Sequence, residues 1–203
     1  MSSAPDPDAE LMLAVKAGSQ QAFGRLFDKY SRSVVSFAFR FVGDAGRAEE
    51  LAQDIFLKVY RAAPRYQPSA KFKTFLFRVA ANHCLNERRR GQYQALHQSS
   101  AEEGAAELSS QDNRSPEQAL HGQELLQHLA EAIDALTPRE KAAFTLSKLE
   151  GMAYQDIALA LETSEAAVKS LIHRASLSVA RQISQTEREP LTEEGGSHGL
   201  PGI

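Results

Sequence analysis

The sequence lacks several features that would place it in other classes of protein. Cys84 is the single cysteine among 203 residues, which excludes an internal disulfide framework and a cysteine-rich zinc site. No apolar run approaches the roughly 18–20 residues of a membrane span, and the polar, acidic first ten residues do not resemble a signal peptide. We therefore expect a cytoplasmic protein without membrane insertion. Glycine-rich phosphate loops and acid–base pairs are also missing, so we expect no enzyme.

The chain as a whole carries no excess positive charge, but one segment of it is strongly basic. The net charge of −3 excludes a uniformly basic nucleic-acid binder. Residues 58–93, however, carry nine Lys or Arg against the single acid Glu87, with six aromatic residues among them. Cations can contact phosphates while rings stack on bases, a combination suited to single-stranded nucleic acid. The alternative interpretation fits this segment equally well: the aromatic rings belong to the protein core, and the charged side chains form a solvent-exposed face.

Strand-like alternation is almost absent, and apolar residues recur at helical spacing, so we expect an all-α fold. Capping residues at Asp6, Ser19 and Asp44 begin three helices, and a fourth ends in the triplet Arg88–Arg90. The segment after it is polar, without periodicity, and acidic, with a charge of −5 over residues 99–124. This composition predicts a helical domain at 1–95, a flexible acidic linker at 96–114, a second helical domain at 115–185 and a disordered tail at 186–203.

The second domain contains the pattern of a helix-turn-helix. A short helix at 154–161 is followed by a three-residue turn, and Ser164 caps a longer helix. One face of that helix is apolar, and the other presents Glu165, Lys169, Ser170, His173 and Arg174. This layout places side chains in a DNA major groove. An ordinary helical hairpin is the alternative.

Two blocks of sequence together carry a family resemblance. The first spans 48–90, with AEELAQDIFLKVYRAAPRY followed by FKTFLFRVAANHCLNERRR. The second spans 136–174, with LTPREKAAFTLSKLEGMAYQDIALAL followed by AVKSLIHR. In this order, and with a variable segment between them, the blocks resemble bacterial sigma factors of the extracytoplasmic-function class in the sigma-70 family. The resemblance implies a sigma-2-like four-helix domain and a sigma-4-like helix-turn-helix domain.

The resemblance also implies a division of function between the domains. The helix at 48–62 would bind the clamp helices of core RNA polymerase, with the second domain near the flap; the matching positions on that helix are Glu50, Leu51, Gln53, Asp54, Phe56 and Tyr60. The following loop and helix would melt and read the −10 promoter element, with contacts from Arg65, Lys71, Lys73, Phe75, Arg78, Asn82, Asn86, Arg88 and Arg89. The helix-turn-helix would read the −35 element. We expect Phe56 and Tyr60 to be exposed, because they lie off the apolar stripe of their helix. An anti-sigma factor is a common partner in this class and therefore a candidate here.

Several positions depart from the pattern of that class. Phe75 stands where Trp is usual, and Asn86 where Asp is usual. In the second domain, Glu162 replaces a glycine, Ala153 replaces a Ser or Thr cap, and Arg is missing at two positions of the second helix. These changes predict weak −35 binding.

The remaining candidate sites are weak. His121 and His128 have a spacing that could bind metal, but no third ligand lies nearby, so we expect no metal and no cofactor. His83 and Cys84 are adjacent on a helix and point in different directions, so they cannot form a nucleophile pair. Two other functions stay open: a transcription regulator that works without binding polymerase, and a helical adaptor that binds only proteins.

Overall fold

The computed structural model describes residues 6–97 and 127–186, and these residues form helices and turns without any strand. The first unit contains α1 (Pro7–Lys16), α2 (Gln20–Val42), α3 (Ala45–Ala62), the 3-10 turn η1 (Ala63–Arg65) and α4 (Phe72–His97). The second unit contains a helical segment at 127–134, then α6 (Pro138–Lys148), α7 (Tyr154–Ala160) and α8 (Glu165–Thr186). The all-α class and the two helical units are confirmed.

The helices begin where the capping residues predict. The side chains of Asp6, Ser19 and Asp44 each accept a hydrogen bond from a backbone N–H in the first turn of α1, α2 and α3. Such a bond satisfies one of the otherwise unpaired amides of a helix N-terminus. Thr137 and Glu140 form a reciprocal capping box at the start of α6. Local sequence therefore sets most helix starts in both units.

Helix α4 is longer than the sequence predicted. It continues to His97, beyond the arginine triplet at which we expected it to end. A single glycine, Gly91, does not stop a helix when good helix formers such as Gln, Ala and Leu follow it. The predicted end of this helix was therefore wrong. The rest of the predicted linker, the segment before 127 and the tail after 186 lie outside the described residues.

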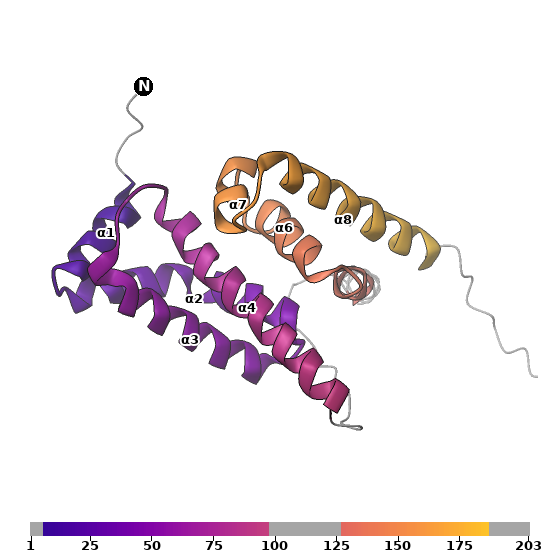
Figure 1. Ribbon diagram of the computed structural model, residues 1–203, viewed down its shortest axis with the longest axis horizontal. Helices are drawn as coiled ribbons and strands as arrows, with labels where there is room; N and C mark the ends of the chain where they lie inside the picture. The colour runs from indigo at the N-terminus through magenta and orange to yellow at the C-terminus, as the bar shows by residue number, and fades with distance from the viewer. Residues whose placement is uncertain (1–5, 98–126, 187–203) are drawn as a thin grey trace, which may run out of the picture.

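The two units pack against each other along α4. Figure 1 shows α4 between the helices of the first unit and those of the second, and α4 contacts both α7 and α6. The buried apolar residues of the first unit form one continuous core with residues of α6 and α7, including Ala143, Leu146 and Ile157. A smaller cluster around Ile133, Phe144 and Val179 joins the segment at 127–134 to α6 and α8. One helix, α4, thus belongs to the core of the first unit and also supports the second.

Candidate nucleic-acid and protein interface

One face of α3 presents a continuous row of exposed side chains. Glu50, Gln53, Asp54 and Tyr60 are exposed and recur at helical spacing. Leu57 lies in the same row and is 44% exposed, almost as much as Tyr60 at 43%. The family resemblance did not single out Leu57, although its place one turn before Tyr60 was visible in the sequence. The row combines carboxylates with two apolar side chains, as a protein-binding surface often does.

Two other residues predicted for this surface, Leu51 and Phe56, are buried instead. The expectation that Phe56 is exposed was wrong, because only 3% of the residue is accessible. Its ring packs against two aromatic rings of α2, with centroid distances of 4.8 Å to Phe27 and 6.4 Å to Phe23. The apolar stripe of α3 alone could not show this, because the covering side chains come from another helix. Phe27 itself is one of the exposed large apolar residues, although its ring covers Phe56.

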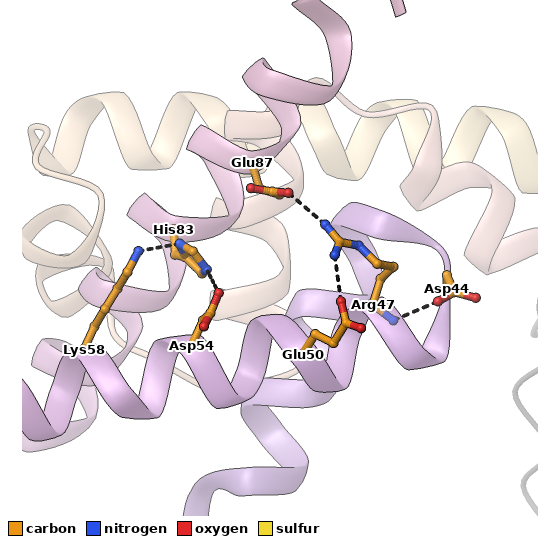
Figure 2. A network of polar contacts seen from close by, with 7 residues as sticks. All are labelled: Asp44, Arg47, Glu50, Asp54, Lys58, His83 and Glu87. Atoms are coloured by element: carbon orange, nitrogen blue, oxygen red, sulfur yellow. Dashed lines mark hydrogen bonds and ion pairs between the residues drawn. The ribbon is translucent and has the colours of Figure 1, made fainter. Parts of the chain in front are cut away.

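Polar contacts connect the exposed row of α3 to α4 (Figure 2). Arg47 forms ion pairs with Glu50 on its own helix, at 2.6 Å, and with Glu87 on α4, at 2.9 Å. Farther along α3, Lys58 Nζ lies 2.6 Å from His83 Nδ1, and Asp54 lies 3.5 Å from His83 Nε2. The predicted protein-binding helix is therefore connected to the predicted nucleic-acid-binding helix at two points.

The connection at His83 requires a neutral imidazole. Burial, together with the positive charge of Lys58, lowers the pKa of His83 below its ordinary value of 6.5, although Asp54 opposes the shift. The neighbouring Cys84 is fully buried, and burial raises the pKa of its thiol to about 12. A thiol held in this state is unreactive, in agreement with the rejection of a nucleophile pair.

The loop before α4 is fixed by residues of α1 and its cap. Asp6 accepts two hydrogen bonds: Oδ1 from the N–H of Asp8, at 3.1 Å, and Oδ2 from the N–H of Phe72, at 2.6 Å. Lys16 Nζ donates to the carbonyl oxygen of Tyr66 at 3.0 Å. The sequence predicted Asp6 as the cap of α1, but its second role, capping α4 across 66 positions of sequence, depends on the tertiary structure.

The aromatic residues around α4 divide between core and surface. Phe72 and Phe77 are fully buried and Tyr66 is buried, so for these three rings the core interpretation is right. Phe75 is half-buried at the edge of this cluster, with its ring 5.1 Å from that of Tyr66 and the Arg78 guanidinium 5.6 Å above it. Phe75 and Arg78 together form a flat, cationic surface on which a base could stack.

Most of the polar residues predicted to contact nucleic acid face the second unit. Lys71 pairs with Asp156 at 3.1 Å, and Lys73 pairs with Glu150 at 3.0 Å. Four others line a cleft of about 490 Å³ between α4 and the start of α6; its lining consists of Asn82, Leu85, Asn86, Arg88, Arg89, Thr137, Pro138 and Arg139. Arg65 and Arg78 are exposed. The structure therefore places six of the nine predicted residues against the second unit, which covers part of this face.

The helix-turn-helix is formed by α7, a tight turn and α8. Glu162 in the turn has a φ of +50°, the left-handed conformation that glycine adopts most easily. Ala153 begins α7 without a side-chain cap, whereas the Ser164 hydroxyl accepts from the N–H of Ala167 at the start of α8. The two departures at Ala153 and Glu162 are therefore structural weaknesses of the kind the sequence indicated.

All five residues predicted to read duplex DNA are exposed on α8: Glu165, Lys169, Ser170, His173 and Arg174. Two of them already have partners within the protein. Arg174 Nε lies 2.8 Å from a carboxylate oxygen of Glu140, which lowers the pKa of Glu140, and the Ser170 hydroxyl donates to a carbonyl of its own helix. Lys169 and His173 remain as the exposed basic residues of this face.

No group of three His, Cys, Asp or Glu residues in the described ranges could hold a metal ion. His121 lies outside those ranges, and His128 is 3.6 Å from Glu131. None of the helices in the described part of the chain is long and apolar enough to cross a membrane.

Comparisons with known proteins agree with this geometry. Residues 26–93 match the family model Sigma-70 region 2, and residues 126–178 match Sigma-70, region 4. RNA polymerase sigma-H factor of Pseudomonas aeruginosa is 30% identical over 91% of this chain and 97% of its own length. ECF RNA polymerase sigma-E factor of Escherichia coli is 30% identical over 87% of this chain and 94% of its own length.

Two solved structures have a similar fold. CnrH, solved in complex with the cytosolic domain of CnrY, aligns with a TM-score of 0.66 and 20% identity over 89% of this chain and 99% of its own. The sigma factor RpoE of Bartonella quintana, solved with the anti-sigma factor NepR, aligns with a TM-score of 0.67 and 18% identity over 80% of this chain and 96% of its own. Region 2 therefore corresponds to residues 26–93 of the first unit. Region 4 corresponds to the second unit, through residue 178 in α8. The chain thus belongs to the sigma-70 family of RNA polymerase sigma factors, in its extracytoplasmic-function class.

Proposed function

We propose that this protein is a promoter-specificity subunit, which binds core RNA polymerase and directs it to start transcription at particular promoters. The main support for the proposal is that polar contacts join α3 and α4 at two points. The exposed row of α3 and the cationic face of α4 are held in a fixed relation by Arg47 and His83 (Figure 2). A polymerase bound to one helix would therefore orient DNA bound to the other.

Binding to the polymerase clamp helices is assigned to the exposed row of α3. Glu50, Gln53 and Asp54 provide polar contacts in its N-terminal half, while Leu57 and Tyr60 provide apolar area at its C-terminal end. Exposed aromatic side chains of this kind often contribute most of the energy of an interface. Leu51 and Phe56 support the row from within the core and do not contact the partner themselves.

Single-stranded −10 DNA is assigned to α4 and its preceding loop. A base that leaves the duplex needs a stacking surface and hydrogen-bonding groups. Phe75 with Arg78 offers the surface, and Asn82 and Asn86 lie one helical turn apart on the same helix. The loop is held rigidly by Asp6 and Lys16, which suits a binding pocket.

Contact with −35 duplex DNA is assigned to α8, and we expect it to be weak. Lys169 and His173 are exposed, but Arg174 is engaged by Glu140. Each basic side chain lost from a phosphate lowers both the affinity and its salt dependence. Specific binding then depends on polymerase holding both units on one promoter, which raises the effective concentration of the second contact.

The same proposal covers the partners and the place of action. Core polymerase and promoter DNA are the partners, and an anti-sigma factor is a further candidate, since RpoE, a protein of similar fold, was solved with the anti-sigma factor NepR. We place the protein in the cytoplasm, where bacterial transcription takes place, as a factor that acts by binding polymerase and DNA.

Transcription in a reconstituted system tests the function directly. The protein is mixed with bacterial core RNA polymerase and a library of promoter fragments, and new transcripts are sequenced. New start sites that require the protein support the proposal. A regulator that acts without binding polymerase would change only the level of existing transcripts, and an adaptor would change neither; either result would exclude a sigma factor.

A pair of variants tests the docking surface. Tyr60→Ala removes an exposed aromatic side chain from the row of α3, and Leu13→Ala removes an apolar side chain of similar exposure from α1. Tyr60→Ala should weaken polymerase affinity about tenfold or more, as truncated interface anchors do. Leu13→Ala should leave the affinity unchanged. Equal affinities for both folded variants would show that this face of α3 is not the docking surface.

A further inference from the structure

The cleft between α4 and the start of α6 is lined by arginines from both units. The two helices contact each other, and the start of α6 lies beside the C-terminal half of α4 (Figure 1). Arg88 and Arg89 line the cleft from α4, and Arg139 lines it from α6. Its described lining contains no carboxylate, so it carries positive charge only. The volume of about 490 Å³ lies within the range of about 300–1,000 Å³ that is usual for small-molecule sites.

The guanidinium groups of the cleft lack partners within the described part of the chain. Arg88, Arg89 and Arg139 form no ion pair there, in contrast to Arg47 on α3 and Arg174 on α8. The Nε atom of Arg88 is buried and has no hydrogen-bond acceptor. A buried N–H without an acceptor destabilises a folded protein, and such groups are rare. An anion bound in the cleft would supply the missing acceptor.

Two further cations near Arg88 increase the excess of positive charge. Lys141 on α6 is only 1% exposed, and its ammonium pairs with Asp134 at 2.6 Å. Burial lowers the pKa of Lys141, and the charges of Arg88 and Arg40 lower it further, although Asp134 opposes the shift. Arg40 Nε is also buried without an acceptor. Three cations therefore lie close to a single described carboxylate, and a second anion would reduce their mutual repulsion.

The residue types of the cleft indicate which anion it would take. Guanidinium groups bind phosphate oxygens in pairs, with fixed geometry. A nucleic acid strand carries one charge per nucleotide along its length, whereas a triphosphate concentrates several charges in one small group and so matches three arginines around one cleft. The described lining offers no carboxylate for Mg²⁺, which usually binds proteins through such groups. The metal-free form of the anion is therefore favoured.

We propose that this cleft is a binding site for a small polyphosphate, either the triphosphate group of a nucleotide or inorganic polyphosphate, held by Arg88, Arg89 and Arg139. Arg139 is specific to this site, because it belongs to region 4 and is not assigned to DNA or polymerase. The two arginines of α4 are shared with the −10 strand, so polyphosphate and strand compete for them. The competition rests on the proposed function of α4, but the binding of polyphosphate does not.

Titration calorimetry of the full-length chain measures this binding. The probes are ATP and inorganic tripolyphosphate, without Mg²⁺, and AMP serves as the monophosphate control. ATP and tripolyphosphate should bind with dissociation constants below about 1 mM, and AMP at least about tenfold more weakly, because a single phosphate cannot reach all three arginines. Equal affinities of the two probes support a site for phosphates alone, and tighter binding of ATP supports a nucleotide site. Absence of binding by both, or equal binding of AMP and ATP, would overturn the inference.

A pair of charge-removing variants on one helix locates the site. Arg139→Gln removes the exposed arginine at the start of α6, and Lys148→Gln removes an exposed lysine at its end. Arg139→Gln should weaken the binding of tripolyphosphate about tenfold or more, as loss of a hydrogen bond between charged groups does. Lys148 lies nine positions farther along α6, about 14 Å away. Its charge is screened over that distance, so Lys148→Gln should change the affinity by less than about twofold.

The arginine-to-lysine variant at the same position tests the geometry of the contact. Arg139→Lys keeps the positive charge but loses the paired N–H groups of a guanidinium. Its affinity for tripolyphosphate should lie between those of the parent and Arg139→Gln. Circular dichroism confirms that each variant is folded. Folded Arg139→Gln and Lys148→Gln with equal affinities would place the polyphosphate elsewhere and refute the inference.

Competition with DNA separates this site from the −10 surface. The probe is a fluorescein-labelled single-stranded oligonucleotide of random sequence, and binding is followed by anisotropy. Arg139→Gln should bind it within about twofold of the parent, whereas tripolyphosphate should displace it from the parent at about tenfold lower concentration than from the variant. If Arg139→Gln loses affinity for the oligonucleotide as much as for tripolyphosphate, the cleft belongs to the DNA surface and the inference fails. A parent protein that binds tripolyphosphate but no oligonucleotide would refute the proposed role of α4 and support the separate polyphosphate site.

Discussion

The clearest test of the packing concerns Phe56. The sequence predicted it on the surface of region 2, whereas the structure places it in the core. Truncating a buried phenylalanine to alanine costs about 3–5 kcal/mol of unfolding free energy, including the cavity that it leaves. Phe56 also loses ring contacts with Phe23 and Phe27, and aromatic pairs contribute about 0.5–1.5 kcal/mol beyond their buried area. We therefore expect Phe56→Ala to lose about 4 kcal/mol, a large part of the roughly 5–15 kcal/mol that stabilises a domain.

Thermal unfolding followed by circular dichroism measures this loss. At about 4–8 °C per kcal/mol for a domain of this size, the Tm of region 2 should fall by roughly 15–30 °C. Phe56→Leu, which keeps most of the apolar volume, should lose far less. Below its lowered Tm, Phe56→Ala should still bind polymerase with normal affinity. A variant with the parent's Tm and weakened polymerase binding would refute the packing argument and identify Phe56 as a surface contact.

Four further predictions concern single residues. Asp6→Ala should cost about 1–2 kcal/mol and speed hydrogen exchange at the amides of Asp8 and Phe72 together, because one carboxylate caps both helices; acceleration at only one amide would contradict this. His83 is neutral in the folded protein and protonates more readily when unfolded, so stability to urea should fall as pH decreases below about 6.5, and His83→Gln should flatten that dependence. Glu162→Gly should raise the stability of region 4 to urea by about 0.5–1 kcal/mol, since it relieves a positive φ; a urea midpoint no higher than that of the parent would contradict this. The Cys84 thiol, with a pKa of about 12, should react with iodoacetamide only after unfolding; rapid labelling of the folded chain would show that the core around it opens.

Local features of this chain could be predicted from sequence because they depend on neighbouring residues. Asp6, Ser19 and Asp44 cap the helices that follow them, and the Thr137 capping box needs only a residue three positions away. Apolar spacing gave the inward face of α8 for the same reason. The end of α4 was missed because no strong breaker marks it, and helix ends without breakers are set by weak propensities.

Contacts between distant segments could not be predicted in this way. The stripe of α3 placed Phe56 outside the core, and only the packing of α2 shows that its ring is covered. The carboxylates that neutralise Lys71 and Lys73 come from the other end of the chain. A charge balance identified the basic segment, but it could not identify which acids would face it, because that depends on how the two units pack.

The two cross-connections between α3 and α4 also have a mechanical consequence. Arg47 and the pair Asp54 and Lys58 lie seven to eleven positions apart on α3, or about 10–16 Å along its axis. Two helices connected at points this far apart resist twisting and sliding against each other, so they move together as one rigid body. A rotation of α3 is then passed on to α4. A pair of dyes on α3 and α4 should therefore report no change of distance when load is applied.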